Sequence, residues 1–115
     1  MLQYDSKPLD LIFHALSDAG RRAMVDRLSR GPASVSDLAR PMPMTLSAVV
    51  QHLKILEDAG LVKSEKVGRV RTCTLEMSAI TNVERWIAER MRFWEQQYDQ
   101  LEAYLADSAS KENQE

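Results

Sequence analysis

Residues 45–62 constrain the fold of this chain more than any other stretch. Their apolar side chains recur every three or four residues, which predicts an amphipathic helix. The inward positions are Leu46, Val49, Leu53 and Leu56. The outward positions near the helix start lack the alternating Glu and Lys of a solvated face and carry Ser47, Ala48, Val50, Gln51 and Lys54. Short side chains let a helix enter a DNA major groove, which is about 12 Å wide, and the Gln51 amide suits an adenine edge. This pattern is typical of a helix that recognises DNA.

Three further helices are expected before this one. The first covers residues 7–17, and its apolar stripe consists of Leu9, Ile12, Phe13 and Leu16. The second covers about residues 18–30, and a short third helix begins after Ser34. The two prolines of the segment 41–44 prevent the third helix from continuing, and Thr45 then caps the fourth.

A β-hairpin is expected after the fourth helix. Gly60 ends that helix, residues 62–66 form a strand, Gly68 lies in a turn, and residues 70–75 form the returning strand. The basic residues at the tip are Lys66, Arg69 and Arg71. They are placed where a contact to the DNA backbone or minor groove is expected beside a recognition helix.

These elements together predict the fold class. Two helices joined by a short turn, the second with an outward small and polar face, form a helix-turn-helix, and the hairpin that follows is a wing. We therefore expect a mainly α protein with one small β-hairpin: a winged helix-turn-helix of four helices, a hairpin and a final helix.

The final helix is predicted over residues 78–107 and carries an apolar seam with heptad spacing, the spacing by which helices pair. The seam consists of Ile87, Met91, Trp94, Tyr98, Leu101 and Leu105. Three aromatic residues, Trp86, Phe93 and Tyr104, widen this apolar face beyond what one small domain needs to cover. We expect a second copy of the chain to cover this face, with Ile87, Met91, Trp94, Tyr98 and Leu101 in the interface of a homodimer.

Length and composition limit the alternatives. A chain of 115 residues with 44% hydrophobic and 28% charged residues is expected to form one folded domain over residues 1–107, followed by a polar, disordered tail at 108–115. Charged residues interrupt the only apolar stretch near the N-terminus, and no run approaches the roughly 18 apolar residues of a membrane span. We expect a cytoplasmic protein without a membrane partner.

The charge distribution is more informative than the net charge of −2. Residues 18–75 contain ten Lys and Arg against six Asp and Glu, so this part carries a net charge of +4 and the flanks carry −6. A basic central unit can bind phosphates although the whole chain is acidic.

The chain also resembles a known family. Residues 11–22, 34–39, 48–62 and 68–71 form four linked motifs, in the right order, that are similar to those of the arsenical-resistance (ArsR/SmtB-type) repressors. The resemblance covers roughly residues 9–105. It implies a homodimeric winged helix-turn-helix repressor that dimerises through its first and last helices and often regulates its own operon. The resemblance thus adds Leu9, Ile12 and Phe13 of the first helix to the expected dimer interface.

The resemblance also maps DNA contacts onto the start of the recognition helix and the wing. The mapped residues are Thr45, Ser47, Val50, Gln51, Lys54, Arg69 and Arg71. Val50 departs from the small hydroxyl residue that many relatives have there, and an apolar contact to a thymine methyl group can replace the hydrogen bond.

Metal, cofactor and catalytic chemistry are not expected. The metal sensors of the resembled family carry Cys or His ligands in the third or last helix. This chain has Ala33, Val35 and Asp37 where the third-helix ligands would stand, and its last helix contains no His. The chain thus resembles the metal-free branch. Two histidines and one cysteine assemble no nucleophile with a base, so we expect neither an enzyme nor a cofactor.

Four other residues could act either in the structure or in the function. We expect Cys73 to point inward as a small apolar residue, with a redox thiol as the alternative. We expect His52 to be packed and hydrogen-bonded, and Arg21 and Arg22 to lie in a solvated or phosphate-facing helix start.

The function predicted is that of a sequence-specific regulator, a repressor that binds a palindromic operator in double-stranded DNA as a homodimer and blocks polymerase. The alternative is a protein-binding winged helix without DNA affinity. Salt distinguishes the two, because phosphate-dependent binding weakens steeply as salt rises. A small-molecule inducer between the dimer helices is a further candidate partner.

Overall fold

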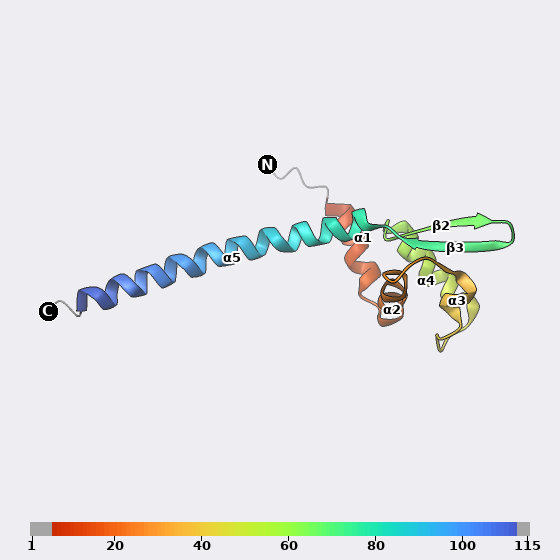
Figure 1. Cartoon of the computed structure of the whole chain (residues 1–115), viewed down its shortest axis with the longest axis horizontal. Coiled ribbons are helices and arrows are strands. Elements are labelled where there is room, and N and C mark those ends of the chain that lie inside the picture. The colour runs from red at the N-terminus through yellow and green to blue at the C-terminus, as the bar shows by residue number, and fades with distance from the viewer. Residues whose placement is uncertain (1–5, 113–115) are drawn as a thin grey trace. The chain divides into compact units, whose positions relative to one another are not determined.

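The computed structural model describes residues 6–112 and contains five helices and three strands in that range (Figure 1). The helices are α1 (Ser6–Leu16), α2 (Ala19–Leu28), α3 (Val35–Ala39), α4 (Leu46–Asp58) and α5 (Met77–Glu112). The strands are β1 (Ala33–Ser34), β2 (Val62–Val67) and β3 (Val70–Leu75). All five predicted helices and both hairpin strands are confirmed, and their order is that of a winged helix-turn-helix.

Side-chain caps fix the starts of the three inner helices. The Asp18 carboxylate accepts a hydrogen bond from the Arg21 backbone N–H at 3.0 Å and begins α2. The hydroxyl oxygens of Ser34 and Thr45 each accept from the third residue beyond them, at 3.1 Å in both cases. Each cap satisfies an N–H that the helix itself leaves without a partner. Thr45 therefore starts α4 where the sequence predicts.

The sheet has one strand more than the sequence indicated. The antiparallel order is β1-β3-β2, with Ala33 opposite Cys73 in the first pair and Val62 opposite Leu75 in the second. β1 contains two residues and shows no period of alternation, so its sequence carries no strand signal. Gly68, with φ +65°, supplies the left-handed conformation in the tight turn that joins β2 to β3.

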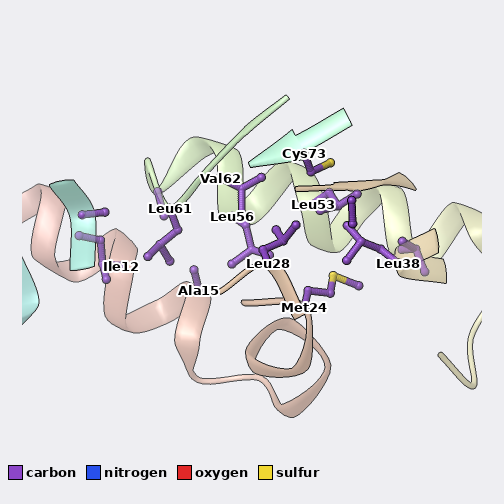
Figure 2. Close-up of a cluster of buried hydrophobic side chains, with 14 residues drawn as sticks. Ile12, Ala15, Met24, Leu28, Leu38, Leu53, Leu56, Leu61, Val62 and Cys73 are labelled. Atoms are coloured by element: carbon purple, nitrogen blue, oxygen red, sulfur yellow. The ribbon is translucent and has the colours of Figure 1, made fainter. Parts of the chain in front are cut away.

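The core lies where α4 packs against α1, α2 and α3 and against the sheet. Figure 2 shows its side chains converging from these elements, with Leu53 and Leu56 of α4 among them. The buried residues are Ile12, Ala15, Met24, Leu28, Ala33, Leu38, Val49, Leu53, Leu56, Ala59, Leu61, Val62, Cys73 and Ala79. Three of the four inward positions predicted for α4 belong to this core.

Leu46 is the exception, because its side chain is 59% exposed. The rotation of about 100° per residue puts Leu46 at the edge of the apolar face, on the side of Val50. Its position in the first turn leaves it outside the packed cluster. The expectation that Leu46 faces the core is therefore wrong.

The chain divides into two compact units, one up to Val83 and one from Glu84 onward. The first holds the helix-turn-helix, the wing and the start of α5, and the second is the remainder of α5. α5 ends at Glu112 and not near residue 107, so residues 108–112 of the expected disordered tail are helical, while 113–115 lie outside the described residues. No helix within residues 6–112 has the length and apolar character needed to cross a membrane.

Candidate nucleic-acid interface

The outward residues at the start of α4, which the sequence predicts to recognise DNA, are exposed to solvent. Ser47, Val50, Gln51 and Lys54 are all exposed, and their spacing places them on one side of the helix. Thr45 is exposed as well, and although its oxygen accepts the capping hydrogen bond, its O–H remains a donor for a phosphate oxygen. The capping residue Thr45 and the four α4 residues predicted from the sequence thus lie together at the N-terminal part of one helix.

A buried arginine fixes the back of this helix. Arg21 of α2 is only 7% exposed, so the expectation that it lies in a solvated or phosphate-facing position is wrong. Its Nε donates to the Ala15 carbonyl at 2.7 Å and its Nη2 to the His14 carbonyl at 3.2 Å, both at the end of α1. Its Nη1 lies 3.1 Å from Nδ1 of His52 on α4. One side chain therefore joins α1, α2 and α4.

The same contact involves a ring nitrogen of His52. A guanidinium group has only donors, so Nδ1 of His52 is the acceptor in this hydrogen bond. The Asp18 carboxylate lies 3.9 Å from the same nitrogen. Its pKa is lowered, chiefly because the backbone N–H of Arg21 stabilises the charged form. His52 is thus the packed, hydrogen-bonded histidine that the sequence analysis expected.

The wing is tied to the end of α4 by a polar chain that the sequence analysis missed. The Arg71 Nε donates to the Ser64 hydroxyl oxygen at 3.0 Å, and that hydroxyl donates to Oε1 of Glu57. The Arg71 Nη2 lies 3.9 Å from the same carboxylate oxygen. Each of these residues is seven positions from the next along the sequence. Because they lie in a helix and two strands, this spacing does not predict that their side chains meet. Only the fold brings them together.

Arg71 remains available to a ligand although it is paired. Its side chain is 58% exposed and, with Lys54, lines a groove of about 480 Å³ between α4, α3 and β3. Lys66 and Arg69 are exposed at the wing tip. Cations thus stand on the recognition helix and on the wing of the same compact unit, where they can meet successive phosphates.

The structure also shows the state of Cys73, the residue with an alternative redox role. Cys73 is fully buried in the core, and burial raises the pKa of its thiol, so it is held as the neutral, weakly reactive form. Among residues that the structure describes, no group of three His, Cys, Asp or Glu side chains is arranged to hold a metal ion.

The residues predicted for the dimer interface differ in exposure. Ile12 is 2% exposed and belongs to the core of its own chain, which leaves little of its side chain for a second copy. Leu9 is half-buried and Phe13 is 40% exposed. Those on α5 are 43–73% exposed in the single chain: Ile87, Met91, Trp94, Tyr98 and Leu101.

Comparisons with known proteins agree with this architecture. A helix-turn-helix domain family matches residues 16–65. The HTH-type transcriptional regulator Rv2034 of Mycobacterium tuberculosis is 39% identical over 85 residues, which cover 74% of this chain and 77% of that protein. A crystal structure of an ArsR-family transcriptional regulator is 50% identical, covers 76% of this chain and 97% of that one, and has a TM-score of 0.74.

A third comparison concerns the fold alone. The homodimeric winged helix-turn-helix DNA-binding domain Mb0332 of Mycobacterium bovis is 21% identical, covers 77% of this chain and 90% of that one, and has a TM-score of 0.62. Fold and exposed face together define this chain as a winged helix-turn-helix DNA-binding transcriptional regulator. It belongs to the ArsR family.

Proposed function

We propose that this protein is a cytoplasmic, non-enzymatic repressor that binds a palindromic operator as a homodimer. The observation that carries the proposal is the exposed start of α4, where base-reading and phosphate-binding side chains lie on one face beside a basic wing. Occupation of a promoter by such a dimer excludes polymerase, and the resemblance described above favours control of its own operon. Thr45, Ser47, Val50, Gln51, Lys54, Arg69 and Arg71 form the proposed contact surface.

The dimer follows from symmetry and from the apolar face of α5. A two-fold dimer presents two copies of α4, which enter successive major grooves only when the half-sites lie about one helical turn or a multiple apart. The heptad seam supplies apolar area that a second copy can cover, and the Mycobacterium bovis domain of the same fold is homodimeric. Phe13 of α1 adds to the proposed interface.

Substitution of Gln51 tests whether the protein recognises bases directly. Duplexes are selected from a random library with the wild-type protein, and the wild type and Gln51→Ala are then titrated with the selected operator and with random DNA. We expect the substitution to cost about 1–3 kcal/mol on the operator and much less on random DNA, because only the operator presents the matching base edge. Gln51 is exposed, so the fold is retained. Equal losses on both duplexes would contradict base recognition by this residue.

Salt dependence distinguishes the proposal from a protein-docking winged helix. We expect Arg69→Ala and Arg71→Ala to weaken binding to all duplexes and to lower the slope of log affinity against log salt by about one each. Lys63→Ala is the matched control, because the register of the hairpin places Lys63 on the face opposite to Arg71. An unchanged slope for an arginine variant removes that residue from the phosphate contacts. The absence of any salt-dependent DNA binding by the wild type would favour protein docking.

A further inference from the structure

Two apolar side chains interrupt the polar, exposed side of α4. Leu46 is 59% exposed and Val50 is 51% exposed, and they are four residues apart, so they lie next to each other on the helix surface. Ser47 and Gln51 form the adjacent row, and Lys54 continues the row of Val50. We call Leu46 and Val50 the apolar step of the recognition helix.

The packing of the core does not require the side chains of Leu46 and Val50. Val49, Leu53 and Leu56 are at most 4% exposed and complete the packed side of α4 without Leu46 or Val50. Neither side chain can donate or accept a hydrogen bond, so neither can form one with a phosphate or a polar base edge. The largest apolar group that a base pair displays in the major groove is the 5-methyl group of a pyrimidine.

We infer that Leu46 and Val50 bind pyrimidine 5-methyl groups and select thymine at two positions of each operator half-site. This inference rests on the proposed function, because it requires α4 to enter the major groove. Four residues advance a helix by about 6 Å, and stacked bases are about 3.4 Å apart, so the two side chains reach methyl groups about one to two base-pair steps apart. The flanking Ser47, Gln51 and Lys54 and the basic wing favour DNA over an apolar protein as the occupant.

The chemistry is that of the methyl group, and two pyrimidines carry it. Thymine has it always, and cytosine has it after methylation at C5. A protein that recognises the methyl group by contact therefore gains affinity from 5-methylcytosine over cytosine at the same position. Burial of one methyl group changes affinity by about fourfold.

The test removes the methyl group from the DNA and its partner from the protein. In the selected operator, each thymine is replaced in turn by uracil, which lacks only the 5-methyl group. We expect wild-type affinity to fall about fourfold at two positions per half-site. Leu46→Ala should abolish the loss at one of them and Val50→Ala at the other. Replacing cytosine by 5-methylcytosine at these positions, in a cytosine-substituted operator, should restore about the same factor in the wild type.

Control measurements separate the possible failures. The side chains of Leu46 and Val50 are exposed, so the two alanine variants should keep the wild-type circular dichroism spectrum. Val67→Ala removes an exposed apolar side chain from β2 and should respond to uracil as the wild type does. An operator that is selected and loses affinity with Gln51→Ala, but tolerates uracil at every thymine, overturns methyl recognition and leaves the proposed function intact. Equal losses in the wild type and in both alanine variants also overturn it. Failure to select any duplex overturns the proposed function and this inference with it.

Discussion

Replacing Trp94 by alanine is expected to convert a dimer into monomers at micromolar concentration and to weaken operator binding more than the loss of any single base contact. Trp94 lies in the middle of the α5 seam and is 73% exposed in the single chain. Removing a central tryptophan from an interface costs about 2 kcal/mol or more, and a two-fold dimer contains the residue twice. The dimer dissociation constant should therefore rise about a thousandfold. Sedimentation and operator titration at fixed salt measure both effects.

A neighbouring substitution provides the control. Gln96 lies on the side of α5 opposite to Trp94 and is also exposed, so Gln96→Ala should leave the dimer and its operator affinity unchanged. Trp94→Ala should retain its helical circular dichroism signal, because an exposed side chain contributes little to the folding of one chain. A wild-type monomer of 13.1 kDa that binds the full palindrome tightly would overturn the dimer and its role in spacing the half-sites.

The sequence predicted those elements whose signals are local. The apolar period of α4 and its Thr45 cap involve residues within one or two turns, and the structure confirms both. The hairpin follows from two short strand segments on either side of the turn at Gly68. The four linked motifs predicted the family, which the comparisons confirm. Local physical chemistry and the order of the motifs were therefore sufficient for the fold class.

Tertiary contacts determined what the sequence could not predict. β1 forms only because Ala33 and Ser34 lie beside β3, and a two-residue strand has no pattern of its own. Leu46 fits the apolar period of α4, but the period does not reveal where the packed elements end. The chain from Arg71 through Ser64 to Glu57 joins a strand, a second strand and a helix, so no helical or strand spacing marks it.

The candidate site also contains residues that local features predict and residues that only tertiary contacts determine. The residues that point outward from α4 were predicted, because outward positions follow from helical period alone. The residue that holds α4 from behind was assigned to solvent, because an arginine in a first helical turn is ordinarily exposed. Arg21 is buried because the end of α1 offers it the carbonyl groups of His14 and Ala15 and because His52 offers a ring nitrogen, an arrangement that exists only in the folded chain.

Arg21→Met is therefore expected to destabilise the protein by about 3 kcal/mol. Methionine keeps much of the side-chain volume but cannot donate to the carbonyl groups of His14 and Ala15 or to the ring of His52. The His14 carbonyl keeps its hydrogen bonds from Ser17, so the Ala15 carbonyl and the His52 ring nitrogen are the acceptors that lose their donor. A buried acceptor left without a partner costs about 1–3 kcal/mol, and the loss is offset in part because a charge no longer has to be desolvated. Denaturant unfolding at fixed protein concentration measures the change as a shift of the midpoint with an unaltered slope.

The adjacent arginine distinguishes burial from charge. Arg22 is exposed and donates from Nη1 to the Leu16 carbonyl at 2.8 Å, so Arg22→Met removes one cation and one hydrogen bond at the same helix start. Its carbonyl partner can turn to water, and we expect a cost below about 1 kcal/mol. Because only folded protein binds the operator, Arg21→Met should weaken operator binding in proportion to the fraction of unfolded protein, whereas Arg22→Met, at a residue outside the proposed contact surface, should leave operator binding nearly unchanged. Equal destabilisation by both variants would show that Arg21 acts through its charge and not as the buried donor that holds the recognition helix in place.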